Sequence, residues 1–296
     1  MSSAAPVPPP GQRDVPPLLA RLVDDAALFP PGNAAMPDAV RRHLDGRTND
    51  RADLVGLFLC PASRLPELIT DLIKVKPPRP VELSLVIDTG LGGVPKALSI
   101  VESRAEMLAL RMVEMPAPSD VDEVWLERVS EFVPEDVIRV IEPRRGGAGW
   151  LDGIQRVIEH GSWPKIRCGG LSEQNFPSIG EVAEFLSVIN AGNSSFKATA
   201  GLHNAVRHTD PETGFTHHGF LNLLVATARL IAGGAGAGAV DESVHEALGS
   251  TDGKALATEA QALTEHEALA VRGVFASYGS CSLTDPVADL EELGLL

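Results

Sequence analysis

Short apolar runs alternate along the chain with longer stretches in which apolar residues recur every three or four positions. The runs are short enough for buried strands, and stretches such as PELITDLIKV and EVAEFLSVINAG have the spacing of amphipathic helices. Strands that alternate with helices of this length predict parallel βαβ units. The predicted strands span residues 54–59, 81–88, 110–114, 137–142, 164–168 and 196–200.

This rhythm predicts an α/β fold, a (β/α) TIM-like barrel, with an open three-layer sheet as the alternative. The strand pattern fades beyond residue 217, so we expect the barrel to be irregular or incomplete in its last third. HHGFLNLLVATARLIAG, residues 217–233, predicts a long helix, and 265–277 predicts another. The glycine-rich stretch 233–239 predicts a hinge or tight turn.

The N-terminal part predicts a tail followed by two helices. Residues 1–17 are rich in proline, serine and alanine, which is typical of a disordered arm. LLARLVDDAALF, residues 18–29, predicts a short helix that ends at the following prolines, and a second helix is expected over 37–44. We expect residues 18–296 to form a single barrel domain.

Composition and charge narrow the function classes. The chain has 296 residues, of which 44% are hydrophobic, and a formal net charge of −15. Such an acidic chain is a poor partner for nucleic acid or for an anionic membrane. It has no apolar run long enough to cross a bilayer and no signal-peptide pattern, and its three cysteines form no CxxC pair, so we expect a cytoplasmic protein. A small anionic metabolite is the expected partner, and homo-oligomerisation is left open.

Charged residues gather where the predicted strands end, which is where parallel α/β folds bind their ligands. Glu114 and Glu142 end two strands, while Lys165 and Lys197 each lie within another. A single residue of this kind could belong to a structural ion pair, but so many charges at one end are costly to bury unless they serve a ligand. We interpret Lys165, Lys197, Glu142 and Glu114 as catalytic candidates. The substrate-binding candidates are Arg167, Thr199, His203, Arg207, His218, Asn222 and Asp88.

These residues suit Schiff-base chemistry. A lysine beside a second cation in a poorly hydrated pocket is expected to have a pKa below the model value of ~10.4, and its neutral amine can attack a carbonyl. Lys165 would be that nucleophile, Lys197 the second cation, and nearby carboxylates would move protons. Two opposing possibilities remain: Glu114 and Glu142 keep both lysines protonated, or the cations clamp an anion, with Arg167 making a bidentate contact.

Four histidines open a metal alternative. His203, His208, His217 and His218 lie within one segment after the sixth predicted strand, and His203, His217 or His218 could bind a divalent metal together with Glu142 or Glu114. No HExxH spacing supports this, so our main expectation is a protein without a cofactor, and a divalent metal is the alternative. The segment 203–218 could cap the pocket as a lid or form an ordinary surface loop.

Two adjacent acids are harder to place. Asp24 and Asp25 interrupt an apolar run, and we expect one of them either to reach the barrel interior or to pair on the surface.

The stretches KIRCG and KATAGLH resemble the two lysine strands of the deoxyribose-phosphate aldolase family. In that family one strand carries the Schiff-base lysine in Lys-Thr-Ser-Thr-Gly and the next carries a second lysine in Lys-Ala-Ser-Gly-Gly. The resemblance implies that Lys165 matches the Schiff-base lysine and Lys197 the second one. It covers about a dozen residues. It departs at Arg167 and Cys168, where the family has small hydroxyl residues. Because Arg167 changes the charge of the pocket, the resemblance does not imply the sugar-phosphate substrate of that family.

A second resemblance covers most of the chain. DDAALFPPG, KIRCGG, FKATAGLHN, HHGFLN and GSCSLTDPVADLEELGLL are similar to stretches of a bacterial family of hypothetical proteins. It implies one coherent unit from about residue 18 to 296 and no particular reaction. The function expected from the sequence is a lyase of the aldolase type acting on a small anionic carbonyl metabolite. The alternatives are a metal-dependent barrel enzyme and a non-catalytic protein that binds an anionic metabolite.

Overall fold

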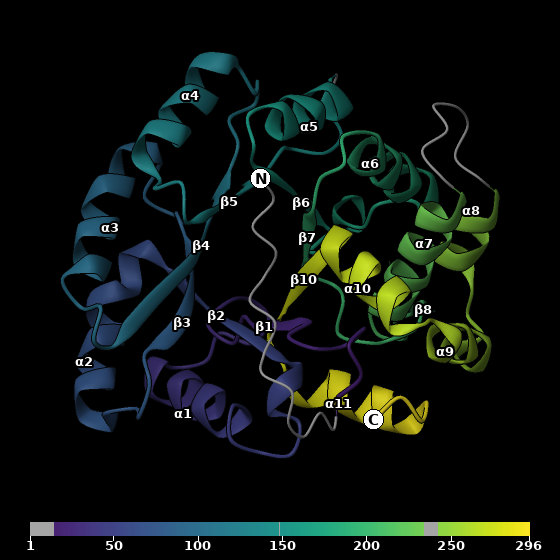
Figure 1. Cartoon of the computed structure of the whole chain (residues 1–296), viewed down its shortest axis with the longest axis horizontal. Helices are drawn as coiled ribbons and strands as arrows, with labels where there is room; N and C mark the ends of the chain where they lie inside the picture. The colour runs from purple at the N-terminus through teal and green to yellow at the C-terminus, as the bar shows by residue number, and fades with distance from the viewer. Residues whose placement is uncertain (1–14, 148, 234–241) are drawn as a thin grey trace.

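Eight parallel strands close into a barrel in the computed structural model, which describes residues 15–147, 149–233 and 242–296 (Figure 1). The strands follow one another around the barrel in chain order, and the first strand closes the ring by pairing with the last. Their bounds are β1 (Val23–Asp25), β2 (Val55–Pro61), β3 (Val81–Val86), β4 (Leu108–Pro116), β5 (Ile138–Glu142), β6 (Trp163–Arg167), β7 (Phe196–Thr199) and β10 (Phe275–Ser280).

Helices surround this barrel and follow most of its strands. In Figure 1 the helices α1 to α6 run around the strands in chain order, and α7 to α10 gather beside β7 and β10. A two-stranded antiparallel sheet, β8 (His208–Thr209) with β9 (Thr216–His217), follows β7. The helices are α1 (Met36–Gly46), α2 (Leu65–Val75), α3 (Val94–Glu102), α4 (Glu123–Phe132), α5 (Trp150–Glu159), α6 (Ile179–Ala191), α7 (Phe220–Gly233), α8 (Glu242–Gly249), α9 (Gly253–Ala262), α10 (Glu265–Val274) and α11 (Thr284–Glu292).

The sequence pattern predicted the fold class correctly, and all six predicted strands are present. The expectation of an incomplete last third is wrong, because β10 and β1 complete the ring. The predicted helix over 18–29 is also wrong. Arg21 has a left-handed backbone with φ of 53°, and its N–H bonds to the carbonyl of Asp53 (2.6 Å), so the chain leaves the helical conformation before β1.

The last strand lies partly inside a predicted helix. The pattern predicted a helix over 265–277, whereas α10 ends at Val274 and β10 begins at the next residue. Phe275 pairs with Phe196 of β7, and the two rings stack with centroids 4.8 Å apart. Packing and strand pairing with a distant part of the chain therefore outweigh the local helical pattern here.

The outer face of the barrel packs against the helices. Phe196, Ala198 and Phe275 on β7 and β10 belong to the main apolar core, which they share with α6 and α7. Alternation along each strand then turns the residues between them inward. Leu57, Met112 and Val140 form a small apolar cluster of their own, which is separate from the outer core.

Two predicted segments lie mostly outside the described residues. The expected arm, residues 1–17, lies outside the described residues except for its last three, of which Val15 is buried in the core. The glycine-rich stretch 233–239 lies outside them apart from Gly233. In the described residues, no helix combines the length and the apolar character needed to cross a membrane.

Candidate active site

A layer of charged side chains crosses the interior of the barrel. Glu114 lies on β4 and Lys197 on β7, and these strands are separated by β5 and β6 in the ring. The two side chains nevertheless form an ion pair, which is possible only across the interior. The polar residues that the sequence places on alternate positions of these strands therefore meet inside the barrel.

Lys197 is the sealed member of this layer. Its side chain is 0% exposed, and its Nζ lies 2.6 Å from Oδ2 of Asp24 on β1 while also contacting Oε1 of Glu114. Burial alone would lower the pKa of Lys197, but Asp24 and Glu114 raise it further than burial lowers it, so the side chain is held as an ammonium.

Lys165 has two carboxylate partners of its own. Its Nζ lies 3.0 Å from Oε2 of Glu114 and 2.9 Å from Oε2 of Glu142, and 7% of its side chain is exposed. It pairs in register with Lys197 on the neighbouring strand, and both amines contact Glu114. Glu114 therefore links the two lysines.

The pKa of Lys165 is raised above its usual value. Burial lowers it, but Glu142 and Glu114 together raise it by more. The expectation of a lowered pKa is therefore wrong for this arrangement, because the sequence pattern did not show that both carboxylates contact the same amine. In return the lysines hold the pKa of Glu114 below its usual range against the effect of burial.

Hydroxyl and backbone groups complete the layer. Ser84 of β3 donates to Oε1 of Glu114 (2.6 Å), and Ser277 of β10 donates to Oδ2 of Asp24 (2.6 Å). The other oxygen of Asp24 accepts the N–H of Leu57 (2.6 Å). Gly56 makes this approach possible, since a Cβ at that position would collide with Asp24. Each carboxylate oxygen of Glu114 and Asp24 therefore has a donor.

Arg167 and Glu142 form the outer edge of the layer, toward the ends of β5 and β6. Nε of Arg167 lies 2.7 Å from Oε1 of Glu142, and the arginine side chain is 47% exposed. Lys165 and Arg167 lower the pKa of Glu142 against the effect of its burial. This edge is where a ligand entering at the carboxyl ends of the strands would first meet positive charge.

The glycines that follow β6 and β7 let their loops meet at this end. Gly201 has φ of 69°, and a Cβ there would lie 2.5 Å from the carbonyl oxygen of Cys168. A Cβ on Gly169 would lie 2.6 Å from Cα of Gly201. The close approach of the two loops therefore depends on both glycines.

Other predicted binding residues lie around or away from this end. Asp88 accepts hydrogen bonds from the N–H (3.0 Å) and hydroxyl of Ser63, and Thr199 lies on β7 on the same face as Lys197. His203 lies beside the thiol of Cys281, with Nδ1 to Sγ at 3.7 Å. Their roles in substrate binding stay predictions.

Arg207 contacts both His218 and Asn222, and the other contacts of the two residues are with backbone carbonyl oxygens rather than with the charged layer. Nε2 of the buried His218 bonds to the carbonyl of Pro177 (2.7 Å), and its Nδ1 lies 3.2 Å from Arg207. Asn222 accepts the N–H of Arg207 and donates to the carbonyl oxygens of Ala247 and Ser250. The protein itself therefore satisfies the polar atoms of His218 and Asn222, and the role of the three residues in substrate binding stays a prediction.

The histidines do not meet the interior carboxylates in a way that would bind a metal. Within the part of the chain that the structure describes, no group of three or more histidine, cysteine, aspartate and glutamate side chains is arranged to hold a metal ion. His217 instead contacts the carbonyl oxygen of Gly201 (3.3 Å) and stacks on His208. The metal alternative therefore lacks a ligand set among these residues.

Sequence reasoning missed three members of the layer. Asp24 was left undecided against Asp25, which in the structure accepts the N–H of Ala27 (3.0 Å) and lies 3.3 Å from the buried His43. Ser84 was not considered, and Ser277 was expected to end a helix, whereas both lie within strands of the barrel. Polar residues at inward positions of a strand were the available signal.

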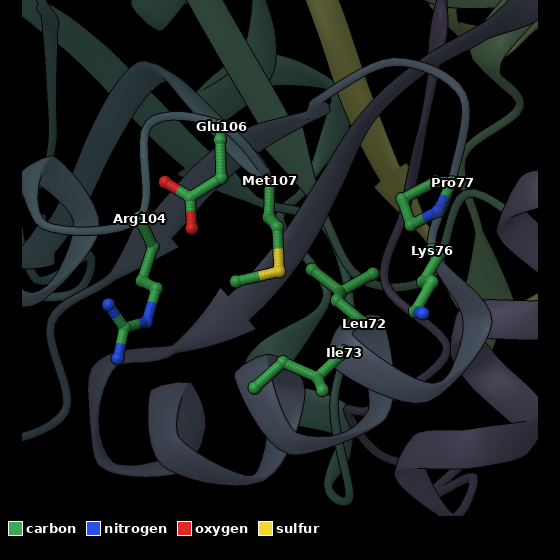
Figure 2. Close-up of a pocket in the computed structure, with 7 residues that line it drawn as sticks. All are labelled: Leu72, Ile73, Lys76, Pro77, Arg104, Glu106 and Met107. Atoms are coloured by element: carbon green, nitrogen blue, oxygen red, sulfur yellow. The ribbon is translucent and has the colours of Figure 1, made fainter.

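A cavity lies away from this layer. A cavity of about 380 Å³ is lined by Leu72, Ile73, Lys76, Pro77, Arg104, Glu106 and Met107, with Arg104 and Lys76 on opposite sides of it (Figure 2). These residues precede β3 and β4, so the cavity lies at the end of the barrel where strands begin. Barrel enzymes use the other end, and we do not place the active site in this cavity.

Comparison of the chain with protein-family models, with curated proteins and with solved structures found no match in any of the three.

Proposed function

We propose that this protein is a lyase of the aldolase type, which forms a Schiff base between Lys165 and a small anionic carbonyl metabolite. The observation that carries the proposal is the contact of the Lys165 amine with two carboxylates, 2.9 and 3.0 Å away. This contact lies near the edge of the charged layer, where a small part of the lysine side chain is exposed. Barrel interiors are usually filled by branched apolar side chains, and a buried ion network is rarely the more stable alternative. A catalytic role for these charged side chains would explain why the protein keeps an ion network inside its barrel.

The two lysines have different proposed roles, because they differ in burial. Lys197 is sealed between Asp24 and Glu114, so it serves as a fixed cation that keeps Glu114 ionised. Lys165 is the amine that a ligand can reach, because part of its side chain is exposed and Arg167 lies next to Glu142 beside it. Arg167 would bind the anionic group of the substrate.

The raised pKa of Lys165 requires a proton acceptor before the amine can react. Glu142 is the nearer of its two carboxylates and lies closer to the mouth, so Glu142 takes the proton from the ammonium as the substrate arrives. The free amine then attacks the carbonyl carbon. The carbonyl oxygen takes one proton from the attacking nitrogen and one back from Glu142 and leaves as water, and a protonated imine remains on Lys165.

The protonated imine has the same charge as the ammonium that it replaces. Glu114 and Glu142, which are placed to stabilise the ammonium, therefore stabilise the imine without rearrangement. The imine draws electrons from the neighbouring carbon–carbon bond. When Glu142 removes the proton of a hydroxyl on the far carbon, that bond breaks, an aldehyde leaves and an enamine stays on Lys165. Protonation of the enamine and hydrolysis of the imine release the second product.

The second candidate is a non-catalytic protein that binds an anionic metabolite. It is favoured by the same raised pKa values, since lysines that stay protonated at neutral pH act as anchors for negative charge. In that case Arg167 and Lys165 bind the ligand and no covalent step follows.

Borohydride trapping separates these possibilities. The protein is incubated with a panel of small aldehydes and keto acids, treated with borohydride and digested, and the peptide masses are measured. The proposal expects modification of Lys165 well above that of the exposed Lys96, and its loss in Lys165→Met but not in Lys96→Met. If Lys165 is never modified above Lys96 across the panel, the lyase proposal fails. Retention of an anion without trapping would then support the binding protein.

A further inference from the structure

Three arginines share one carboxylate at the base of the barrel, the end at which the strands begin. Glu82 is the second residue of β3 and lies on the same face as Ser84, toward the interior. Its Oε2 accepts from Arg21 (2.7 Å) and Arg47 (3.4 Å), and its Oε1 accepts from Nε of Arg111 (3.1 Å). These arginines come from three separate segments, just before β1, just after α1 and within β4.

The base therefore has an excess of positive charge in a strongly acidic chain. Asp53 and Arg79 also lie close enough to Arg47 to affect its pKa, so the group made by these residues with Arg21, Arg111 and Glu82 contains four arginines and two carboxylates. The whole chain has a formal net charge of −15. The pKa of Arg47 is lowered by burial and then by Arg21, which indicates that the positive charges repel one another despite Glu82.

The guanidinium group of Arg47 and the backbone of Arg21 are held in place by main-chain hydrogen bonds. Arg47 donates from Nη1 to the carbonyl oxygens of Val55 (3.1 Å) and Gly56 (3.4 Å). The backbone of Arg21 is fixed by its N–H bond to the carbonyl of Asp53. A cluster that is fixed before a ligand arrives loses less conformational entropy on binding than a mobile one.

Donors remain available to a ligand. Each guanidinium has five N–H groups, and Glu82 occupies one nitrogen of each arginine. Arg111 is 50% exposed and Arg21 and Arg47 are each 31% exposed, so solvent reaches all three side chains. In the described part of the chain, the Nη1 and Nη2 groups of Arg111 have no hydrogen-bond acceptor.

We propose that Arg21, Arg47 and Arg111 form a binding site for a phosphate group at the base of the barrel. A phosphate group matches the forked donors of several arginines and its two negative charges offset the local excess. Glu82 keeps the arginines together and competes with the ligand for them. This site is independent of the proposed lyase chemistry, since the ligand does not contact the charged layer around Lys165.

Titration calorimetry tests the site with two probes, inorganic phosphate and glycerol phosphate, at pH 8 and constant ionic strength, with chloride as the reference anion. Preference for the inorganic ion identifies free phosphate as the ligand, and preference for the ester identifies a phosphorylated metabolite. Arg111→Gln should weaken binding at least tenfold, because a charge-assisted contact is lost. Arg41→Gln, which removes an exposed arginine on α1, should leave the affinity unchanged.

Glu82→Gln supplies a test of opposite sign. Removing the competing carboxylate should tighten phosphate binding about tenfold, provided that the melting curve confirms a folded protein. A merely structural role for Glu82 predicts equal or weaker binding instead. The proposal is overturned if phosphate binds no better than chloride, if Arg111→Gln binds as tightly as the unmodified protein, or if Glu82→Gln fails to tighten binding. Loss of the phosphate signal in Arg167→Gln would also overturn it, since the phosphate would then bind at the mouth.

Discussion

Replacing Lys197 by methionine should destabilise the protein more than replacing Lys165. Lys197 is the cation that Asp24 contacts, so Lys197→Met leaves Asp24 with only the Ser277 hydroxyl and the Leu57 N–H. Lys165→Met has a milder consequence, because Glu114 keeps Lys197 and Glu142 keeps Arg167. Both changes remove one charge, but only the first leaves a buried carboxylate without a cation in direct contact with it.

The magnitude follows from the burial of the partners. Asp24 and Glu114 are each 1% exposed, and breaking a buried ion pair by removing one member costs about 3–5 kcal/mol. With an unfolding entropy of about 2.1 cal/mol/K per residue over this chain, that loss lowers the melting temperature by roughly 5–8 °C. We expect Lys165→Met to cost about 1–3 kcal/mol, which is the loss of hydrogen bonds to charged groups whose partners remain paired.

The pH dependence gives a second readout. In the unmodified protein the pKa of Glu114 is lowered, so its contribution to stability is present above the unfolded pKa of about 4.3 and is lost as the pH falls below it. In Lys197→Met the largest pairing contribution to Glu114 is gone and only its contact with Lys165 remains, so the pKa of Glu114 should rise. Proton uptake then offsets part of the lost ion pairing, so the difference in stability between variant and unmodified protein should shrink between pH 7 and pH 5.

Calorimetric or circular-dichroism melting of the two variants and of Lys96→Met, a change at an exposed lysine, measures these effects. The reasoning is refuted if Lys197→Met melts within about 2 °C of the unmodified protein, or if Lys165→Met is the less stable of the two. A pH-independent difference between Lys197→Met and the unmodified protein would refute the assignment to unpaired carboxylates.

Three further changes have definite expected outcomes. Glu142→Gln removes the largest contribution that raises the pKa of Lys165, so the pH midpoint of borohydride trapping, measured from pH 7 to 11, should fall; an unchanged midpoint would contradict the pairing. Gly201→Ala places a Cβ against the Cys168 carbonyl at a left-handed φ and should cost about 2 kcal/mol or more in urea unfolding, whereas Gly214→Ala, also at positive φ but with open space around it, should cost less. Burial lowers the pKa of His218 to about 4, so its neutral form is favoured in the fold and stability should fall as the pH drops below about 6.5; His218→Gln should flatten that slope, and an unaltered slope would count against it.

The strand–helix rhythm predicted most of the barrel, and its two failures have a common cause. β1 has only three residues, and the apolar positions around it also fit a helix, so no local pattern identifies Val23–Asp25 as a strand. β10 follows α10 directly, with no loop residue between Val274 and Phe275. In both cases the strand exists because of its partners, which lie far away in the sequence.

The site was predictable as a list of charged residues but not as a set of contacts. Alternation along β6 correctly put Lys165 and Arg167 on one face, and the order of the strands brought Glu142 beside them. The sign of the lysine pKa shift depended on which carboxylates contact each amine, and sequence spacing does not fix that. The contact of Asp24 with Lys197 could not be predicted for the same reason, since it requires the pairing of β1 with β10.

That closure has a consequence for how the molecule assembles. Asp24 and Ser277, which bond across the seam, are 253 residues apart in the chain. Contacts of such long sequence separation form late, because the loop between them must be ordered first. Until the seam closes, Lys197 has Glu114 but lacks Asp24, so the interior charge is unbalanced in every intermediate with an open ring. We therefore expect closure of the seam and completion of the ion network to occur in one step of refolding. An intermediate that lacks β10 should be unable to pair Asp24 with Lys197 inside the barrel.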